Sequence, residues 1–589
     1  MNVIATAGHV DHGKSTLVRL LTGMEPDRWA EERRRGLTID LGFAWTDLPG
    51  AGEVAFVDVP GHERFVPNML AGVGPVPAVL FVVAADEGWR AQSGEHLAAL
   101  DALGVEHAVL AVTRADLADP AAALADARAR IATTALGPVP AVAVSATSGA
   151  GLDQLRTELA ALANRLPAPD PDADVRLWVD RSFTIRGAGT VVTGTLTAGT
   201  VRPGDELEVG AGRTVRVRGV QALGTARPAV SGVARVAVNL RGGDHRELGR
   251  GDTLLAPSRW RHTATVDVEL RNPADPLPQR LILHLGAAAV PVRIRPLGTV
   301  HTGLARLALD RPLPLRVGDR GLLRDPGRHA IAAGIAVLDV HPPPLTRRGA
   351  ATRRGADLAA ARAGGSAALA ELAVRNGGLL TTTDLAAAGL PAAGSATGVG
   401  DWRADPVRWK ELAAAAVPAW QRWRAANPVA AGMPAEALRR ALNLPDPALL
   451  APLVAAAGLT LSAGLVRHGD SGLPDRLERA IGTVERDLAV TPFAAPEAYR
   501  LDELGLGPKE IAAAARAGRL LRLTPQVVLL PGAPAAAAEI LATLPQPFTL
   551  SQARQALHTT RRVAVPLLEH LDRAGHTTRN PDDTRTVTG

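Results

Sequence analysis

The stretch GHVDHGKST, residues 8–16, has the residue types and spacing of a phosphate-binding loop. Glycine lets backbone N–H groups converge on phosphate oxygens, and a helix that begins where the loop ends adds a favourable dipole. Lys14 is one of only three lysines in the chain, and its compact ammonium would reach the β- and γ-phosphates better than a guanidinium. The residues expected to bind phosphate are Gly8, His9, Val10, Asp11, His12, Gly13, Lys14, Ser15, Thr16 and Gly61.

Two later motifs could hold a magnesium ion beside those phosphates. DVPGH follows a predicted strand, so Asp58 could hold Mg²⁺ through a water molecule while the Gly61 N–H meets the γ-phosphate. RRRGLTID contains Thr38, whose hydroxyl would join that of Ser15 on the metal only while the γ-phosphate is present. The expected metal-binding residues are therefore Ser15, Thr38 and Asp58.

A third pair of motifs could select the base. TRAD and a later SA each follow a predicted strand. The carboxylate of Asp116 could accept hydrogen bonds from N1 and N2 of guanine, two groups that adenine does not offer. The residues expected at the guanine are Thr113, Arg114, Asp116, Ser145 and Ala146.

The elements that must position these residues change in kind along the chain. Continuous apolar strands alternate with helical patterns up to residue 170, which predicts a parallel sheet covered on both faces. Short alternating strands with frequent Gly and Pro-Gly turns then predict two β-barrels, and short helices with hairpin signals predict a C-terminal array of winged helices. The expected fold class is thus an α/β P-loop GTPase domain, two β-barrels and a winged-helix array. The expected boundaries are 1–170, 175–258, 259–342, 356–426, 427–472, 473–532 and 533–589.

Composition excludes several other classes of protein. The chain has no cysteine, so disulfides, thiolate zinc sites and thiol nucleophiles are ruled out. No window approaches the ~18 consecutive apolar residues of a membrane span, and the first residues lack the pattern of a signal peptide. We therefore expect a cytoplasmic protein with no membrane contact. A net charge of +6 permits an anionic partner without requiring one.

GHVDHGKST, RGLTID, DVPGHERF and TRAD together resemble the translational GTPases of the elongation factor Tu group, over about residues 1–342. The resemblance implies that GTP and Mg²⁺ are bound and that the ribosome stimulates hydrolysis. It implies that His62 positions the attacking water, with Val10 and Leu37 as an apolar gate. The usual guanine motif of the group reads Asn-Lys-x-Asp; here Thr113 keeps a hydroxyl, and Arg114 could stack on a purine as lysine does.

The long extension makes the chain resemble the bacterial selenocysteine-specific elongation factors (SelB type), which add winged helices to that core. RGLTIDLGF, DVPGHERFVPNMLAG and RRVAVPLLEHLDRAG carry this likeness. It implies that selenocysteinyl-tRNA is the cargo, with Asp180, Arg181 and Arg235 lining the aminoacyl pocket. A selenol is mostly ionised at neutral pH and a seryl hydroxyl is not, so cationic groups could discriminate between them. An ordinary ion pair on the barrel surface between Asp180 and an arginine is the alternative interpretation.

The same resemblance implies that the last winged helix binds an mRNA hairpin that recodes UGA. It also implies that the ribosome is a further partner and that the factor is a monomer. Arg561 and Arg562 begin its second helix, where helix dipole and side chains would both face phosphates. Arg554 and Arg579 could extend this surface, and a solvated arginine face is the alternative interpretation for each of the four residues. Two other functions stay open: a nucleotide-gated DNA-binding regulator, and a GTPase whose array docks proteins.

Overall fold

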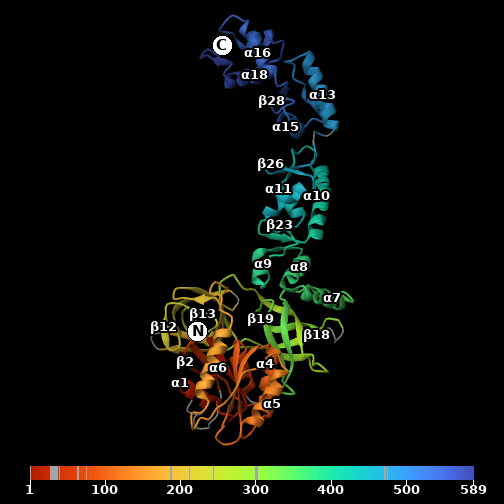
Figure 1. Cartoon of the computed structure of the whole chain (residues 1–589). Coiled ribbons are helices and arrows are strands. Elements are labelled where there is room, and N and C mark those ends of the chain that lie inside the picture. Colours follow the sequence, from red (N-terminus) through yellow and green to blue (C-terminus); the bar gives the residue numbers. More distant parts are fainter. Residues whose placement is uncertain are drawn as a thin grey trace. The chain divides into compact units, whose positions relative to one another are not determined.

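The computed structural model describes residues 2–26, 38, 40–62, 65–74, 76–185, 189–210, 212–242, 245–298, 303–469, 473 and 475–588. The chain divides into two compact units, Met1–Asp405 and Pro406–Gly589. The first contains a G domain, two barrels and a small helical module, which run from red to green in Figure 1. No helix among the described residues is long and apolar enough to cross a lipid bilayer.

The G domain is built on a six-stranded sheet in the order β2-β3-β1-β4-β5-β6. All neighbouring pairs are parallel except β2 with β3. The central strands are buried along almost their whole length because helices cover both faces, which explains their continuous apolar sequence. In sheet order the strands are Gly42–Leu48, Gly52–Asp58, Asn2–Gly8, Ala78–Ala84, His107–Thr113 and Ala141–Ala143.

Alternate residues of each strand enter two separate cores. On β1, Ile4 packs with helices α1 and α6, whereas Val3 and Ala5 pack with α3, α4 and α5. Because parallel strands all point the same way, the loops at their carboxyl ends gather along one edge of the sheet, and the predicted nucleotide motifs occupy these loops. The helices are α1 Lys14–Thr22, α3 Val66–Val73, α4 Ala91–Leu103, α5 Ala121–Ala132 and α6 Leu152–Arg165.

The next two domains are barrels. In barrel II the strand order is β10-β15-β7-β8-β14-β11-β12, and an additional β10–β11 pairing closes the ring. Barrel III is closed, in the order β16-β19-β18-β17-β20-β21. Barrel II consists of β7 Arg176–Ile185, β8 Gly189–Ala198, β9 Thr200–Val201, β10 Glu206–Val209, β11 Arg213–Ala222, β12 Thr225–Arg227, β13 Val230–Ser231, β14 Ala234–Arg241 and β15 Thr253–Leu255, with a 3-10 turn at His245–Glu247. Barrel III consists of β16 His262–Arg271, β17 Arg280–Leu285, β18 Ala288–Pro296, β19 Leu304–Pro314, β20 Arg320–Asp325 and β21 Ala330–Asp339.

A buried ion-pair network joins barrel III to the helix that follows it. Asp267 has no exposed surface and contacts Arg306 at 2.6 Å and Arg354, on α7, at 2.7 Å. Arg354 also pairs with Asp339. A small module of helices and a three-stranded sheet completes the unit: α7 Ala350–Ala363, α8 Gly365–Gly377, β22 Leu379–Thr381, α9 Thr382–Ala387, β23 Thr397–Val399 and β24 Trp402–Ala404.

The second unit repeats the winged-helix order of helices followed by a hairpin. Its first helix, α10, packs against α11, α12 and β25. The sequence placed α10 at the end of the first winged helix, with a boundary at residue 426; the structure ends the preceding unit at Asp405 and packs α10 with the following elements instead. This part contains α10 Pro406–Ala426, β25 Met433–Pro434, α11 Ala435–Ala441, a 3-10 turn Pro447–Leu449, α12 Leu450–Ala456, β26 Thr460–Ser462 and β27 Leu465–Arg467.

Two further helix-and-hairpin groups share one apolar core that reaches the C-terminal strands. The last group has a clear start signal, because Thr549 and Gln552 form a capping box at its second helix. A bridge between Phe548 and Arg585 adds a third strand position to its hairpin. The elements are α13 Asp475–Val490, α14 Ala498–Glu503, α15 Pro508–Arg516, β28 Leu521–Thr524, β29 Val527–Leu529, α16 Ala533–Ala542, α17 Leu550–Ala556, α18 Arg561–Ala574, β30 Thr577–Arg579 and β31 Arg585–Val587.

Candidate functional site: a nucleotide loop and two outlying surfaces

The loop between β1 and α1 takes backbone conformations that require glycine. Gly8 has φ 130°, and a Cβ there would overlap the carbonyl oxygen of Val82. Gly13 caps α1 with φ 83°, and Asp11 also lies in the left-handed region with φ 65°. The strand, the tight loop and the helix start therefore follow one another as a phosphate-binding loop requires.

Lys14 lies across the mouth of this loop. Its Nζ donates to the carbonyl oxygens of Gly8 at 3.1 Å and His9 at 2.7 Å. Gly61, from the DVPGH motif, approaches so closely that a Cβ there would overlap Lys14 Nζ and lie 2.6 Å from the Val10 nitrogen. The backbone of DVPGH at Gly61 thus lies directly against the phosphate loop, and the Lys14 ammonium lies next to this contact.

The three expected metal-binding side chains meet beside this ammonium. Ser15 Oγ donates to Asp58 Oδ2 at 2.6 Å and lies 2.9 Å from Thr38 Oγ1. Asp58 is fully buried and accepts a second hydrogen bond, 2.8 Å, from the hydroxyl of Thr6, whose oxygen accepts the Val59 N–H. Sequence reasoning missed Thr6, although a hydroxyl inside the apolar run VIATAG was a visible signal.

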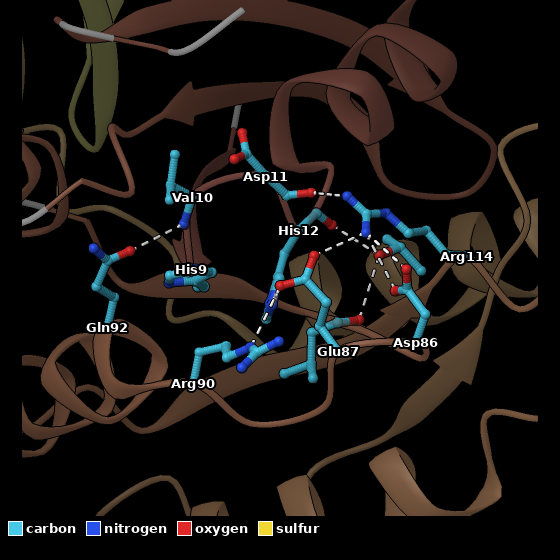
Figure 2. A network of polar contacts seen from close by, with 12 residues as sticks. His9, Val10, Asp11, His12, Asp86, Glu87, Arg90, Gln92 and Arg114 are labelled. Atoms are coloured by element: carbon cyan, nitrogen blue, oxygen red, sulfur yellow. Dashed lines mark hydrogen bonds and ion pairs between the residues drawn. The ribbon is translucent and has the colours of Figure 1, made fainter. Parts of the chain in front are cut away.

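His62 lies just beyond Gly61 and is partly buried, with its ring 5.9 Å from that of Phe65. Val10 of the predicted gate lies on the phosphate loop, and its N–H donates to Gln92 Oε1 at 3.3 Å (Figure 2). Leu37, the other gate residue, lies outside the described residues. Gln92 belongs to α4 and no sequence motif indicated it.

Thr113, one of the residues expected at the guanine, makes a bracing contact with the phosphate loop. Its hydroxyl donates to the carbonyl oxygen of His12 at 2.8 Å, which ties the end of β5 to the phosphate loop. Because Thr113 is buried, its hydroxyl has a structural role in this hydrogen bond.

Arg114 is held by acidic neighbours. Its Nη1 donates to Asp86 at 2.9 Å and to Glu87 at 2.9 Å, and Nη2 donates to the carbonyl oxygen of Asp11 (Figure 2). The sequence interpretation gave this guanidinium a stacking role on the base. In the structure it links the phosphate loop to the turn after β4, and its residue has φ 55°.

Asp116 projects into solvent at the rim of a pocket of about 250 Å³. A hydrogen bond with the Ser145 side chain lowers the pKa of Asp116, so the group is a carboxylate acceptor at neutral pH. Leu117, beside it, is 67% exposed and could cover one side of a bound base. The pocket is lined by Asp11, Gly13, Thr16, Leu17, Thr113, Arg114, Asp116, Leu117, Val144, Ala146 and Thr147.

Two buried histidines pack at the phosphate loop, His12 within the loop and His96 on the neighbouring helix α4. Nδ1 of His96, on α4, accepts the Gly8 N–H at 3.0 Å. Burial, reinforced by the charge of Lys14, lowers the pKa of His96 to about 3, so the ring is neutral and has a lone pair for this bond. Burial also lowers the pKa of His12 to about 4, and its ring makes an edge contact with that of His9, 4.9 Å between centroids.

The expected aminoacyl residues lie where barrel II meets the G domain. Asp180 is buried, accepts a hydrogen bond from Thr193 at 2.8 Å and pairs with Arg235. The guanidinium of Arg235 lies over the Phe43 ring at 3.8 Å, and that of Arg181 lies 5.8 Å from the same ring. The ion pair of the alternative interpretation is therefore present, but it lies at a domain junction where two guanidinium groups are close to one aromatic ring.

The four arginines expected to bind RNA have different surroundings. Arg554 and Arg561 are exposed, and their side chains make no hydrogen bond to the described part of the chain. Arg579 pairs with Asp583 across its hairpin, 3.0 Å from Nε. Arg562 instead joins the last winged helix to the preceding one, and its acceptors are the Ala495, Pro496 and Gln526 carbonyl oxygens and the Glu497 carboxylate.

Comparison with known proteins agrees with this architecture. Residues 1–165 match the elongation factor Tu GTP-binding domain. Residues 263–344 match the β-barrel domain of the selenocysteine-specific elongation factor, and 539–586 match the winged helix of elongation factor SelB. The bacterial selenocysteine-specific elongation factor EF-Sec has a similar fold over the whole chain, with a TM-score of 0.78 and 24% identity.

Two curated relatives are the selenocysteine-specific elongation factors of Desulfomicrobium baculatum, 37% identical over 65% of this chain, and Escherichia coli (strain K12), 40% identical over 59%. The matches span 62% and 56% of those two relatives. Translation initiation factor 2 subunit gamma of Natronomonas pharaonis is 35% identical over 37% of this chain.

The sheet, the phosphate loop and the match over residues 1–165 make the first domain similar to the GTP-binding domain of elongation factor Tu. Beyond that domain, residues 263–344 are similar to the β-barrel domain of the selenocysteine-specific elongation factor and residues 539–586 to the winged helix of elongation factor SelB, in agreement with the two curated relatives.

Proposed function

We propose that the protein is a GTP-dependent elongation factor that delivers selenocysteinyl-tRNA to the ribosome at recoded UGA codons while its last winged helix binds an mRNA hairpin. The observation that supports this most directly is the presence, in one chain, of a domain that matches the elongation factor Tu GTP-binding domain, with Ser15 and Asp58 in contact, and a winged helix that matches that of SelB. The DNA-binding alternative gains no support from the matched winged helix.

The donor set beside Lys14 fits a magnesium ion. Two hydroxyls and one carboxylate supply the hard oxygen donors that Mg²⁺ prefers, and Ser15 lies within hydrogen-bonding distance of both Thr38 and Asp58. Ser15 and Thr38 would bind the ion directly and Asp58 through water, with Thr6 fixing the carboxylate. The bound ion would neutralise charge on the β- and γ-phosphates.

The remaining nucleotide contacts follow from the same geometry. Lys14 would exchange its two carbonyl partners for phosphate oxygens, and the Gly61 N–H would donate to the γ-phosphate. Asp116 would accept hydrogen bonds from the guanine edge. His62 would orient the attacking water once the ribosome fixes its side chain, and hydrolysis would then release the contact of Thr38.

The cargo and message sites are proposed at the two outlying surfaces. Asp180, Arg181 and Arg235 would surround the selenocysteinyl side chain, where a selenolate adds a negative charge that a seryl group lacks. Exposed Arg554 and Arg561, extended by Arg579, would contact phosphates of the hairpin. Arg562 is assigned to packing between winged helices.

The decisive measurement compares selenocysteinyl-tRNA with seryl-tRNA of the same tRNA body. With a non-hydrolysable GTP analogue, we expect the protein to bind the selenocysteinyl form at least tenfold more tightly, because a lost buried charge pair costs about 1.5–3 kcal/mol. With GDP, both affinities should be weak. Equal binding of the two tRNAs in the GTP form would contradict the proposed cargo.

A further inference from the structure

Asp40 links the nucleotide site to the proposed aminoacyl pocket. It follows Thr38 by two residues, and Thr38 contacts Ser15 at the metal donors. Its Oδ2 pairs with Arg181 Nη2 at 2.9 Å, and the same Nη2 donates to the Leu41 carbonyl oxygen at 2.8 Å. Residues directly after Thr38 therefore contact a guanidinium of barrel II.

Arg250, on barrel II, contacts the other carboxylate oxygen of Asp40. Its Nη2 donates to Asp40 Oδ1 at 2.7 Å, its Nη1 contacts Asn68 on α3, and its Nε lies 3.4 Å from the Asp180 carbonyl oxygen. One side chain thus contacts the residues after Thr38, the helix after DVPGH and the backbone of the pocket. Neither Asp40 nor Arg250 was among the sequence candidates.

Each carboxylate oxygen of Asp40 contacts a guanidinium, Oδ2 that of Arg181 at 2.9 Å and Oδ1 that of Arg250 at 2.7 Å. The side chains of Asp40 and Arg181 are each 21% exposed, so solvent screens this pair less than a surface pair.

The G domain also contributes an aromatic ring to the proposed pocket. Phe43 lies three residues after Asp40, and the Arg235 guanidinium lies over its ring at 3.8 Å. Arg181 uses only Nη2 for its hydrogen bonds to the described residues, so Nε and Nη1 remain for a ligand. An anionic group bound there would contact the Arg181 guanidinium. Asp40 orients this guanidinium and leaves the Nε and Nη1 donors of Arg181 available.

We infer that Asp40 and Arg250 are positioning residues that make the aminoacyl pocket depend on the bound nucleotide. While Thr38 is held at the metal site, Asp40 orients Arg181 toward the cargo, and Arg250 holds Asp40 and Asn68 together. When Thr38 is released after hydrolysis, Asp40 withdraws and Arg181 loses its fixed orientation. This inference rests on the proposed function, because it concerns how that same cargo is gripped.

The test uses the full chain carrying Asp40→Asn, loaded with a non-hydrolysable GTP analogue or with GDP at saturating nucleotide. Selenocysteinyl-tRNA affinity should fall about tenfold in the GTP-analogue form, since a charged hydrogen bond becomes a neutral one, and should hardly change in the GDP form. The preference over seryl-tRNA should fall by a similar factor. Asp40→Glu should restore part of the loss, and Arg250→Gln should act in the same direction as Asp40→Asn.

Glu53→Gln is the matched control, because Glu53 pairs with Arg227 and so joins the same two domains away from the pocket arginines. It should leave cargo discrimination unchanged. Unchanged discrimination in Asp40→Asn, beside a wild type that discriminates, would overturn the inference alone. Tighter cargo binding by Asp40→Asn would also overturn it, since Asp40 would then be a competitor for Arg181. A wild type without discrimination would overturn the proposed function, and this inference with it.

Discussion

At the scale of single residues, a histidine that is buried in its neutral form makes the free energy of unfolding depend on pH. The pKa of His96 is lowered by burial to about 3, whereas the unfolded value is about 6.5. Between these values the unfolded chain binds one more proton than the native chain. The contribution of His96 to stability is therefore complete above pH 6.5 and is lost as the pH falls toward 3.

We expect the His96→Asn variant to show a shallower loss of stability on acidification. Asparagine Oδ1 takes the place of Nδ1 as acceptor for the Gly8 N–H but does not titrate. The wild-type free energy of unfolding should fall more steeply than that of the variant, by about 1.4 kcal/mol per pH unit below pH 6. Thermal melts from pH 7 to 4.5 measure this, with exposed His558→Asn as control. Parallel curves for wild type and His96→Asn would exclude a neutral buried His96.

At the scale of elements, two adjacent arginines on α18 have different roles: Arg562 packs against the preceding winged helix, and exposed Arg561 is proposed to bind RNA. Arg562 donates to four acceptors of the preceding winged helix, so Arg562→Ala should lower the melting temperature of the second unit and cost about 1.5–3 kcal/mol. Its hairpin affinity should change less than that of Arg561→Ala. Calorimetry on both variants checks this, and an unchanged melt for Arg562→Ala would remove its packing role.

Arg561→Ala should leave stability unchanged and weaken hairpin binding. The exposed side chain would lose one phosphate contact, so the slope of log affinity against log salt should become shallower by about 0.7–0.9. A salt titration with the RNA hairpin measures the slope. An unchanged slope would place the phosphate contacts on other residues.

Elements that local sequence determines were predictable, and contacts between distant segments were not. The apolar runs around Phe81 and Leu110 indicated a covered sheet, and the matched domains and fold confirm the class. Arg250 lies 210 residues from Asp40, and no pattern around either predicts their contact. The position of α10 was misjudged because its apolar face does not reveal which neighbour it packs on.

At the scale of the whole molecule, arginine–carboxylate pairs connect the domains of the first unit. Arg176 of barrel II donates to Asp319 of barrel III through two bonds of 2.7 and 2.8 Å, and its guanidinium lies 4.7 Å from the Trp260 ring. Lysine cannot reproduce this planar double contact. Arg176→Lys should therefore lower the melting temperature and cost about 1–3 kcal/mol, whereas Arg202→Lys, at an exposed site, should not. Differential scanning calorimetry compares them; equal melts would show that the double contact contributes nothing.

The scarcity of lysine has a practical consequence for chemical labelling. Lys410 and Lys509 are exposed, whereas the Lys14 ammonium is enclosed by the loop it serves. A reagent specific for lysine amines thus meets just one target at the nucleotide site and two elsewhere. Mass spectrometry of the modified chain can therefore report occupancy of that site against two internal standards, without any engineered label.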